Sequence, residues 1–144
     1  MSMLMDLETQ LIAHEGLRLD MYKDTVGIWT IGVGRNLEDV GLRSEAEARF
    51  LLKSDILTIS SELERRLPWI EGLDEVRTRV LLDMAFNLGG AGLMKFQNTL
   101  RYVSEGRYDL AAQEMLSSKW ARQVGRRAQR LSEMMESGKD REAE

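Results

Sequence analysis

The segment from residue 15 to residue 34 constrains the fold of this chain most, because it interrupts a sequence that otherwise has helical periodicity. Two runs of partly alternating residues that favour β-structure, 17–22 and 28–31, flank the turn-forming residues 24–27. Glycines punctuate the segment at Gly16, Gly27, Gly32 and Gly34. This pattern predicts a β-hairpin.

Such a hairpin would bring three polar side chains towards one another: Glu15 at its entry, Asp24 in its turn and Thr30 on its returning strand. Two carboxyl groups suit glycoside hydrolysis. One protonates the leaving oxygen, and the other acts as base or nucleophile or stabilises the oxocarbenium-like transition state. Two acids nine positions apart are common in any sequence, so a longer pattern has to carry the argument.

That longer pattern is present. Glu-Gly-Leu-Arg-Leu (15–19), Tyr-Lys-Asp-Thr (22–25) and Gly-x-x-Thr-Ile-Gly-x-Gly (27–34) resemble, in order and spacing, the bacteriophage-type lysozymes, the phage endolysins of glycoside hydrolase family 24. The resemblance implies an inverting muramidase that cleaves the β-1,4 bond between N-acetylmuramic acid and N-acetylglucosamine. It assigns the general acid to Glu15, the second carboxylate to Asp24 and a water-positioning hydroxyl to Thr30.

The resemblance also implies an α+β, mostly helical fold with two lobes in a single domain, 1–144. Residues 16–43 would form the small hairpin lobe and residues 44–67 a connecting helix. Residues 68–144, together with 1–15, would form the larger helical lobe, with the substrate cleft between the two lobes.

The residue pattern supports helices on both sides of the hairpin. Apolar residues recur every three or four positions over 3–15, and Gly16 is a typical stop. Ser44 and Glu47 form a capping box at the start of a long helix, which the single proline, Pro68, ends. Further helices are expected over 74–88, before Gly106 and over 107–117.

The position of Glu15 has two opposing consequences for a general acid. The last residue of a helix lies at the negative end of the helix dipole, which disfavours a carboxylate and favours the protonated form that a general acid needs. The resemblance implies that Arg127 pairs with Glu15, which acts in the opposite direction. The sequence leaves the balance between these two effects open.

The resemblance extends to a candidate substrate-binding set: Phe86, Asn87, Thr99 and Arg127. Within Asp-Met-Ala-Phe-Asn-Leu-Gly (83–89), Phe86 and Asn87 would face the cleft, where Asn87 could hydrogen-bond sugar or order a water. An asparagine before glycine can equally close a helix end. Thr99 would supply a hydroxyl that lines the cleft.

One residue departs from the family pattern. Arg35 follows Gly34 where many relatives have histidine. An ion pair built on that histidine is therefore absent or replaced, for example by a pair between Arg35 and a local acid such as Glu38 or Asp39.

Composition excludes several other classes of site. The chain has 144 residues, 43% of them hydrophobic and 31% charged, as expected of one globular domain. Without cysteine it has no disulfide framework or thiolate metal site. With His14 as its only histidine, neither a histidine zinc site nor a Ser-His triad is expected, and we expect no cofactor.

Two other functions compete with hydrolysis. A basic stretch, residues 119–130, contains Lys119, Arg122, Arg126, Arg127 and Arg130 and no acid. It could bind cell-wall carboxylates or nucleic acid, or be a solvated helix face. A net charge of −4 and the lack of a recognisable DNA-binding motif argue against nucleic acid. The other alternative is a catalytically inactive lysozyme-like module that binds peptidoglycan or protein, against which the intact Glu15, Asp24 and Thr30 argue.

The sequence also predicts where the protein acts. No run approaches the roughly 20 apolar residues of a membrane span, and the first ten residues carry acids but no lysine or arginine. We expect a monomer that accumulates in the host bacterial cytoplasm without stable membrane association. It would reach peptidoglycan after a separate holin breaches the inner membrane. Carriage on a virion is the alternative route.

Overall fold

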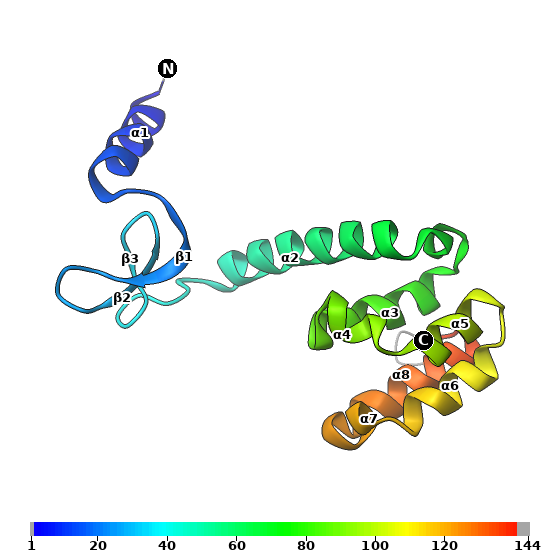
Figure 1. Cartoon of the computed structure of the whole chain (residues 1–144). Helices are drawn as coiled ribbons and strands as arrows, with labels where there is room; N and C mark the ends of the chain where they lie inside the picture. Colours follow the sequence, from blue (N-terminus) through cyan, green and yellow to red (C-terminus); the bar gives the residue numbers. More distant parts are fainter. Residues whose placement is uncertain (1, 141–144) are drawn as a thin grey trace. The chain divides into compact units, whose positions relative to one another are not determined.

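The computed structural model describes residues 2–140 and divides the chain into two compact units, Met1–Leu51 and Leu52–Glu144 (Figure 1). The first unit contains a helix and a small sheet. The described part of the second contains only helices and their connections. This composition confirms the predicted α+β, mostly helical fold class. The prediction that residues 1–15 join the helical lobe stays a prediction.

The first helix, α1 (Met3–Glu15), lies at its predicted position. The N–H of Met5 donates to the hydroxyl of the N-cap residue Ser2 at 3.2 Å. Gly16 ends the helix with a φ of 79°, a conformation that favours glycine, and its N–H donates to the carbonyl of Ile12 at 2.9 Å. Local chemistry at each end therefore accounts for the bounds of α1.

Three strands form an antiparallel sheet in the order β1 (Arg18–Lys23), β2 (Trp29–Gly32) and β3 (Arg35–Asn36), coloured blue to cyan in Figure 1. The hairpin of β1 and β2 around residues 24–27 is confirmed. The sequence analysis missed β3, because a strand of two residues leaves no alternating pattern. As the middle strand, β2 places Thr30 opposite Tyr22 on one side and Asn36 on the other.

Strand β1 carries a bulge. Arg18 pairs with Gly32 and Tyr22 pairs with Thr30, so three residues of β1 lie opposite the single residue Ile31. The alternating apolar residues of this segment are all exposed: Leu17, Leu19 and Met21. Their alternation in the sequence therefore does not mark a buried face of the sheet.

Helix α2 (Glu45–Arg66) contributes residues to both units, and its bounds lie close to those of the helix expected over 44–67. Its first turn contains half of the predicted capping box, since the N–H of Glu47 donates to the hydroxyl of Ser44 at 3.1 Å. The side chain of Glu47 forms an ion pair with Arg35 of β3. The start of α2 is thereby tied to the sheet.

The expected local partners of Arg35 are wrong. Besides its ion pair with Glu47, Arg35 donates to the carbonyl of Gly41 at 3.0 Å. Glu38 instead accepts a hydrogen bond from the backbone N–H of Trp29 at 2.8 Å. The error arose because Glu38 is close in sequence, whereas the ion pair depends on how the connection before α2 folds back.

The second unit is a bundle of short helices that follow α2. They are η1 (Pro68–Gly72), α3 (Glu75–Leu88), α4 (Gly90–Met94), α5 (Gln97–Ser104), α6 (Tyr108–Leu116), α7 (Lys119–Val124) and α8 (Arg126–Ser137). Helix α6 packs against α5 and α8, and α3 packs against α4 and α8. Asp74 caps α3, accepting from the N–H of Arg77 at 3.1 Å. Among the described helices, none combines the length and the apolar character that crossing a membrane requires.

Glycine marks two boundaries between helices. Gly89 ends α3, and α4 starts at once from Gly90. Gly125, with a φ of 58°, separates α7 from α8. The basic stretch 119–130 therefore lies on two helices and is not one continuous helix face.

Candidate active site

Asp24 is held by the turn that joins β1 to β2. Its Oδ1 accepts hydrogen bonds from the backbone N–H groups of Val26 and Ile28, each at 2.9 Å. Its own N–H donates to the carbonyl of Ile28 at 2.9 Å. This is an Asx turn, in which a short side chain takes the place of backbone hydrogen bonds. The carboxylate is fixed through one oxygen, and Oδ2 makes no hydrogen bond with any residue of 2–140.

Thr30 belongs to the same hydrogen-bonded chain. It is 4% exposed, and its hydroxyl donates to the carbonyl of Ile28 at 2.9 Å. Ile28 therefore links the carboxylate of Asp24 to the hydroxyl of Thr30 through its N–H and its C=O. Because the hydroxyl proton points at Ile28, the lone pairs of the Thr30 oxygen remain to accept a hydrogen bond from a water molecule.

Glu15 is the last residue of α1, as the sequence predicted, and is exposed. Its side chain lies against the turn between β2 and β3, at Gly34. The first unit thus carries all three predicted catalytic residues: Glu15 at a helix end, Asp24 in a turn and Thr30 on the middle strand.

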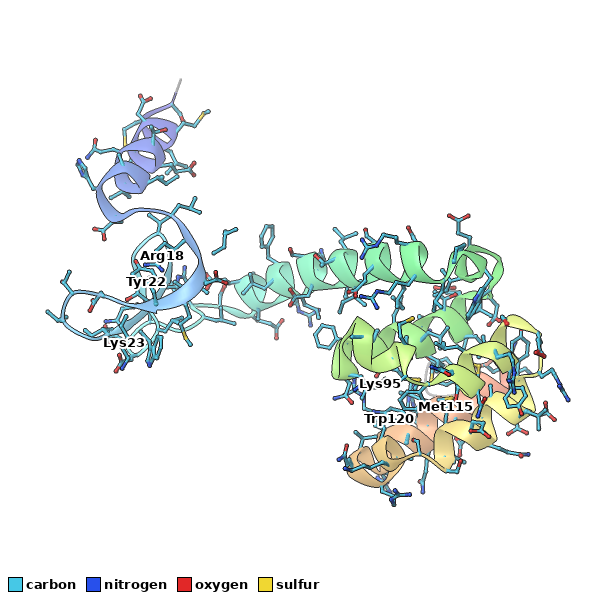
Figure 2. All side chains as sticks on the ribbon, in the orientation of Figure 1. Arg18, Tyr22, Lys23, Lys95, Met115 and Trp120 are labelled. Atoms are coloured by element: carbon cyan, nitrogen blue, oxygen red, sulfur yellow. The ribbon has the colours of Figure 1, made fainter. Side chains whose placement is uncertain are left out.

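Aromatic and basic side chains form cation–π contacts on the sheet of this unit. Figure 2 labels Arg18, Tyr22 and Lys23, which all come from β1. The guanidinium of Arg18 lies 4.2 Å from the centre of the Tyr22 ring, and the ammonium of Lys23 lies 5.1 Å from the Trp29 ring. Cation–π contacts at exposed sites are worth about 0.5–1 kcal/mol each. They therefore add to the stability of a sheet that has no apolar core.

The predicted substrate-binding residues lie on the second unit. Asn87 is exposed in the last turn of α3, and its Oδ1 accepts a hydrogen bond from the indole N–H of Trp120 at 2.8 Å. Trp120, labelled in Figure 2, is 4% exposed and packs edge-on against Phe96, so it is a core residue. The oxygen of Asn87 is thus occupied, and its amide NH₂ makes no hydrogen bond with a described residue.

Two pockets of the second unit divide these residues. Phe86 and Arg127 line a pocket of about 410 Å³, whereas Thr99 and Trp120 line another of about 690 Å³. Thr99 is 2% exposed, and its hydroxyl bonds to no described residue. Since no side-chain oxygen in the described part of the chain is both buried and unpaired, this hydroxyl reaches the pocket surface.

Arg127 has a partner within its own unit. Its guanidinium forms an ion pair with Asp83 at 2.6 Å and also donates to the backbone carbonyl of Asp83 at 3.3 Å. The sequence analysis did not identify Asp83 as that partner, although a carboxylate one turn before Asn87 was visible. The predicted pairing of Arg127 with Glu15 stays a prediction.

The sequence analysis missed other residues of potential function. Ile28 joins Asp24 to Thr30 through its backbone, so its side chain gave no signal. Lys95, Gln97 and Glu114 line the 690 Å³ pocket with Thr99. Gln97 stands two positions before Thr99, so this polar segment could have indicated a wider polar wall.

Two carboxyl groups, here Asp24 in a turn and Glu15 at a helix end, are the groups that a glycoside hydrolase needs. Comparison with known proteins gives the family. The model of the phage lysozyme family matches residues 12–137. The chain belongs to the phage lysozyme family, and it is a muramidase, a glycosidase that hydrolyses peptidoglycan.

Individual relatives agree. A probable T4-type lysozyme 1 of Dictyostelium discoideum is 30% identical over 164 residues, which cover 94% of this chain and 96% of the relative. A SAR-endolysin of Enterobacteria phage P21 is 30% identical over 96 residues, or 64% of this chain and 56% of that protein. The pre-baseplate central spike protein Gp5 of Enterobacteria phage T4 is 26% identical over 93% of this chain but only 28% of its own length.

Proposed function

We propose that this muramidase cleaves the β-1,4 bond between N-acetylmuramic acid and N-acetylglucosamine, with Glu15 as general acid and with Asp24 and Thr30 holding the attacking water. The observation that carries the proposal is the hydrogen-bonded chain from Asp24 through Ile28 to Thr30. It places an oriented carboxylate and an oriented hydroxyl on one rigid element. A hydrolase needs that arrangement to hold a nucleophilic water in place.

The same chain supports inversion at the anomeric carbon. The available Oδ2 of Asp24 would accept a proton from the water, while the lone pairs of Thr30 accept the second water hydrogen. An inverting enzyme activates water on the face of the sugar opposite the general acid, with carboxyl groups about 6.5–9.5 Å apart. Asp24 is then a base rather than a covalent nucleophile.

The second unit would bind the rest of the glycan strand. The amide NH₂ of Asn87 can donate to a sugar oxygen because Trp120 already holds the amide oxygen. The hydroxyl of Thr99 can do the same from the wall of its pocket, and Phe86 offers an exposed ring to a sugar face. Arg127, held by its ion pair with Asp83, would contact the glycan strand beside Phe86.

Exchange of Glu15 for glutamine tests the assignment of the acid. The substitution Glu15→Gln keeps the shape of the side chain but removes the proton that it donates. General acid catalysis contributes about 10²–10⁴-fold, so the rate of peptidoglycan hydrolysis should fall by that factor with an unchanged melting temperature. Glu8→Gln, on the exposed surface of the same helix, is the matched control and should hydrolyse like the wild type.

Two measurements complete this test. Turbidity of purified peptidoglycan gives the rate, and proton NMR of the first reducing ends gives the configuration. Near wild-type hydrolysis by Glu15→Gln would remove Glu15 from the mechanism, and a retained β configuration would contradict the role given to Asp24. Tight binding to peptidoglycan without any bond cleavage by the wild type would instead favour the inactive-module alternative.

We also propose that the enzyme accumulates in the host cytoplasm and releases phage progeny once a separate holin has breached the inner membrane. Expression alone in a Gram-negative host should leave cells intact, and permeabilising the inner membrane should then cause rapid lysis. The Glu15→Gln variant should fail at that last step. Prompt lysis without any membrane breach would contradict this route. Detection of the protein in purified virions would favour carriage on the particle; one relative is named a pre-baseplate central spike protein.

A further inference from the structure

Gly34 differs from the other described glycines of the first unit in what an added side chain would meet. A Cβ built on Gly34 would lie 2.7 Å from Oε2 of Glu15, 3.2 Å from its Cδ and 3.3 Å from its Cβ. The other glycines within residues 2–51 have no atom within 4 Å of that position: Gly16, Gly27, Gly32 and Gly41. The side chain of Glu15 therefore lies directly against the bare backbone of the β2–β3 turn.

Backbone conformation alone does not explain this contact. Gly34 has a φ of 65°, which favours glycine, and so does Gly32 with 66° at the other end of the same turn. A Cβ added at Gly34 would meet Glu15, whereas one added at Gly32 would meet no atom within 4 Å. The turn thus requires glycine at both positions for its backbone conformation. At Gly34 the absence of a side chain also leaves room for the proposed acid.

A side chain at Gly34 would displace the group that performs the chemistry. Real Cβ atoms essentially never lie within 3.0 Å of a heavy atom outside their own residue and its two chain neighbours, so Oε2 of Glu15 would have to move. The end of a glutamate side chain is flexible, and the fold would tolerate that movement. Catalysis would not, because a displacement of about 1 Å in a reacting group can lower a rate about 10²-fold.

We propose that Gly34 is a positioning residue for Glu15, and the inference rests on the function proposed above for that residue. The β2–β3 hairpin holds Thr30 in its first strand and presents bare backbone to Glu15 at its turn. One element thereby fixes the general acid relative to the hydroxyl that positions the water. Gly34 sets the place of the Glu15 carboxylate, while Asp24 and Thr30 are set by their own hydrogen bonds.

The substitution Gly34→Ala tests this inference, with Gly32→Ala as its matched control. Both variants force alanine into a φ near 65°, so the melting temperature should fall by a similar amount in both. Hydrolysis of solubilised, uncross-linked peptidoglycan strands should show kcat about 10²-fold lower for Gly34→Ala with KM within about threefold. The control should keep kcat within about threefold of the wild type.

A second readout does not depend on activity. The ¹³Cδ resonance of Glu15, assigned by its loss in Glu15→Gln, should move in Gly34→Ala and stay in place in Gly32→Ala. Equal kcat values and an unmoved resonance in Gly34→Ala would overturn the proposal. If Gly34→Ala fails to fold, the double variant Glu15→Ala/Gly34→Ala is measured instead. It lacks the carboxylate that the new side chain would meet, so its melting temperature should equal that of Glu15→Ala/Gly32→Ala. Failure of that double variant to fold would also overturn the proposal.

The failure of this inference can be told apart from failure of the proposed function. An inactive Glu15→Gln, with Gly34→Ala and Gly32→Ala behaving alike, would contradict the positioning role alone. An active Glu15→Gln would contradict the assignment of the acid, and the positioning role would fail with it.

Discussion

The two units of this enzyme are stabilised in different ways. Every buried apolar side chain of the described chain lies between Leu63 and Met135, in the second unit. Of the described residues in the first unit, Thr30 alone is buried, and it is polar. The second unit therefore has an apolar core of the usual kind, whereas turns, hydrogen bonds and left-handed glycines determine the conformation of the first.

This difference separates stability from chemistry. In the second unit a change of side-chain volume alters packing and hence the free energy of unfolding. In the first unit the residues that define the local backbone include those that we propose for the chemistry, as with Asp24 in its turn. Substitutions in the first unit should therefore alter the rate more than the stability, and substitutions in the core of the second should do the reverse.

Truncation of a core leucine should give the largest effect. Leu81 of α3 is fully buried, and Leu81→Ala should lower the free energy of unfolding by about 2–5 kcal/mol. Activity per folded molecule should stay near that of the wild type. Chemical denaturation combined with the turbidity assay measures both quantities. Leu57→Ala, at a position 69% exposed, is the control and should stay within about 0.5 kcal/mol.

Removal of the Thr30 hydroxyl should show the opposite behaviour. The carbonyl of Ile28 keeps the N–H of Asp24 as a donor, so Thr30→Val should cost about 0.5–1.5 kcal/mol of unfolding free energy. The rate should fall about 10²-fold, because the water loses an oriented partner. Thr25→Val, exposed in the adjoining turn, is the control. A loss of stability above about 3 kcal/mol without a loss of rate would contradict the separation of the two units.

Much of the fold was predictable from the sequence because its signals are local. The ends of α1, α2 and α3 depend on neighbouring residues, such as Ser44 before α2 and Gly16 after α1, and each was predicted. Strand β3 was not, and neither was the immediate start of α4 after Gly89. Both are too short for a period to show, and tertiary context decides them.

In the candidate site, too, local patterns were predictable from the sequence and contacts that depend on the fold were not. The family pattern indicated Glu15, Asp24 and Thr30, but it could not show that the backbone of Ile28 connects two of them. Nor could it pair Arg35 with Glu47 or Arg127 with Asp83. Each ion pair joins residues at least twelve positions apart, and such contacts are determined by how the chain folds back rather than by any local pattern.

The smallest effect concerns the basic stretch 119–130 of the second unit. Arg127 and Arg130 form ion pairs with Asp83 and Asp140, whereas Arg122 and Arg126 are exposed and make no ion pair with any residue of 2–140. Together with Lys119, which is likewise exposed and has no ion pair with residues 2–140, they are the residues of this stretch that we expect to attract cell-wall carboxylates. Exposed charges contribute about 0.2–1 kcal/mol, so Arg122→Gln/Arg126→Gln should slow lysis only about two- to fivefold at low salt. The effect should vanish near 1 M salt, where the Debye length is about 3 Å.

The control is Lys53→Gln/Arg65→Gln, which removes the same charge from exposed positions on α2 and should change lysis less at low salt. Equal losses in both double variants would mean that net charge, and not this stretch, attracts the substrate.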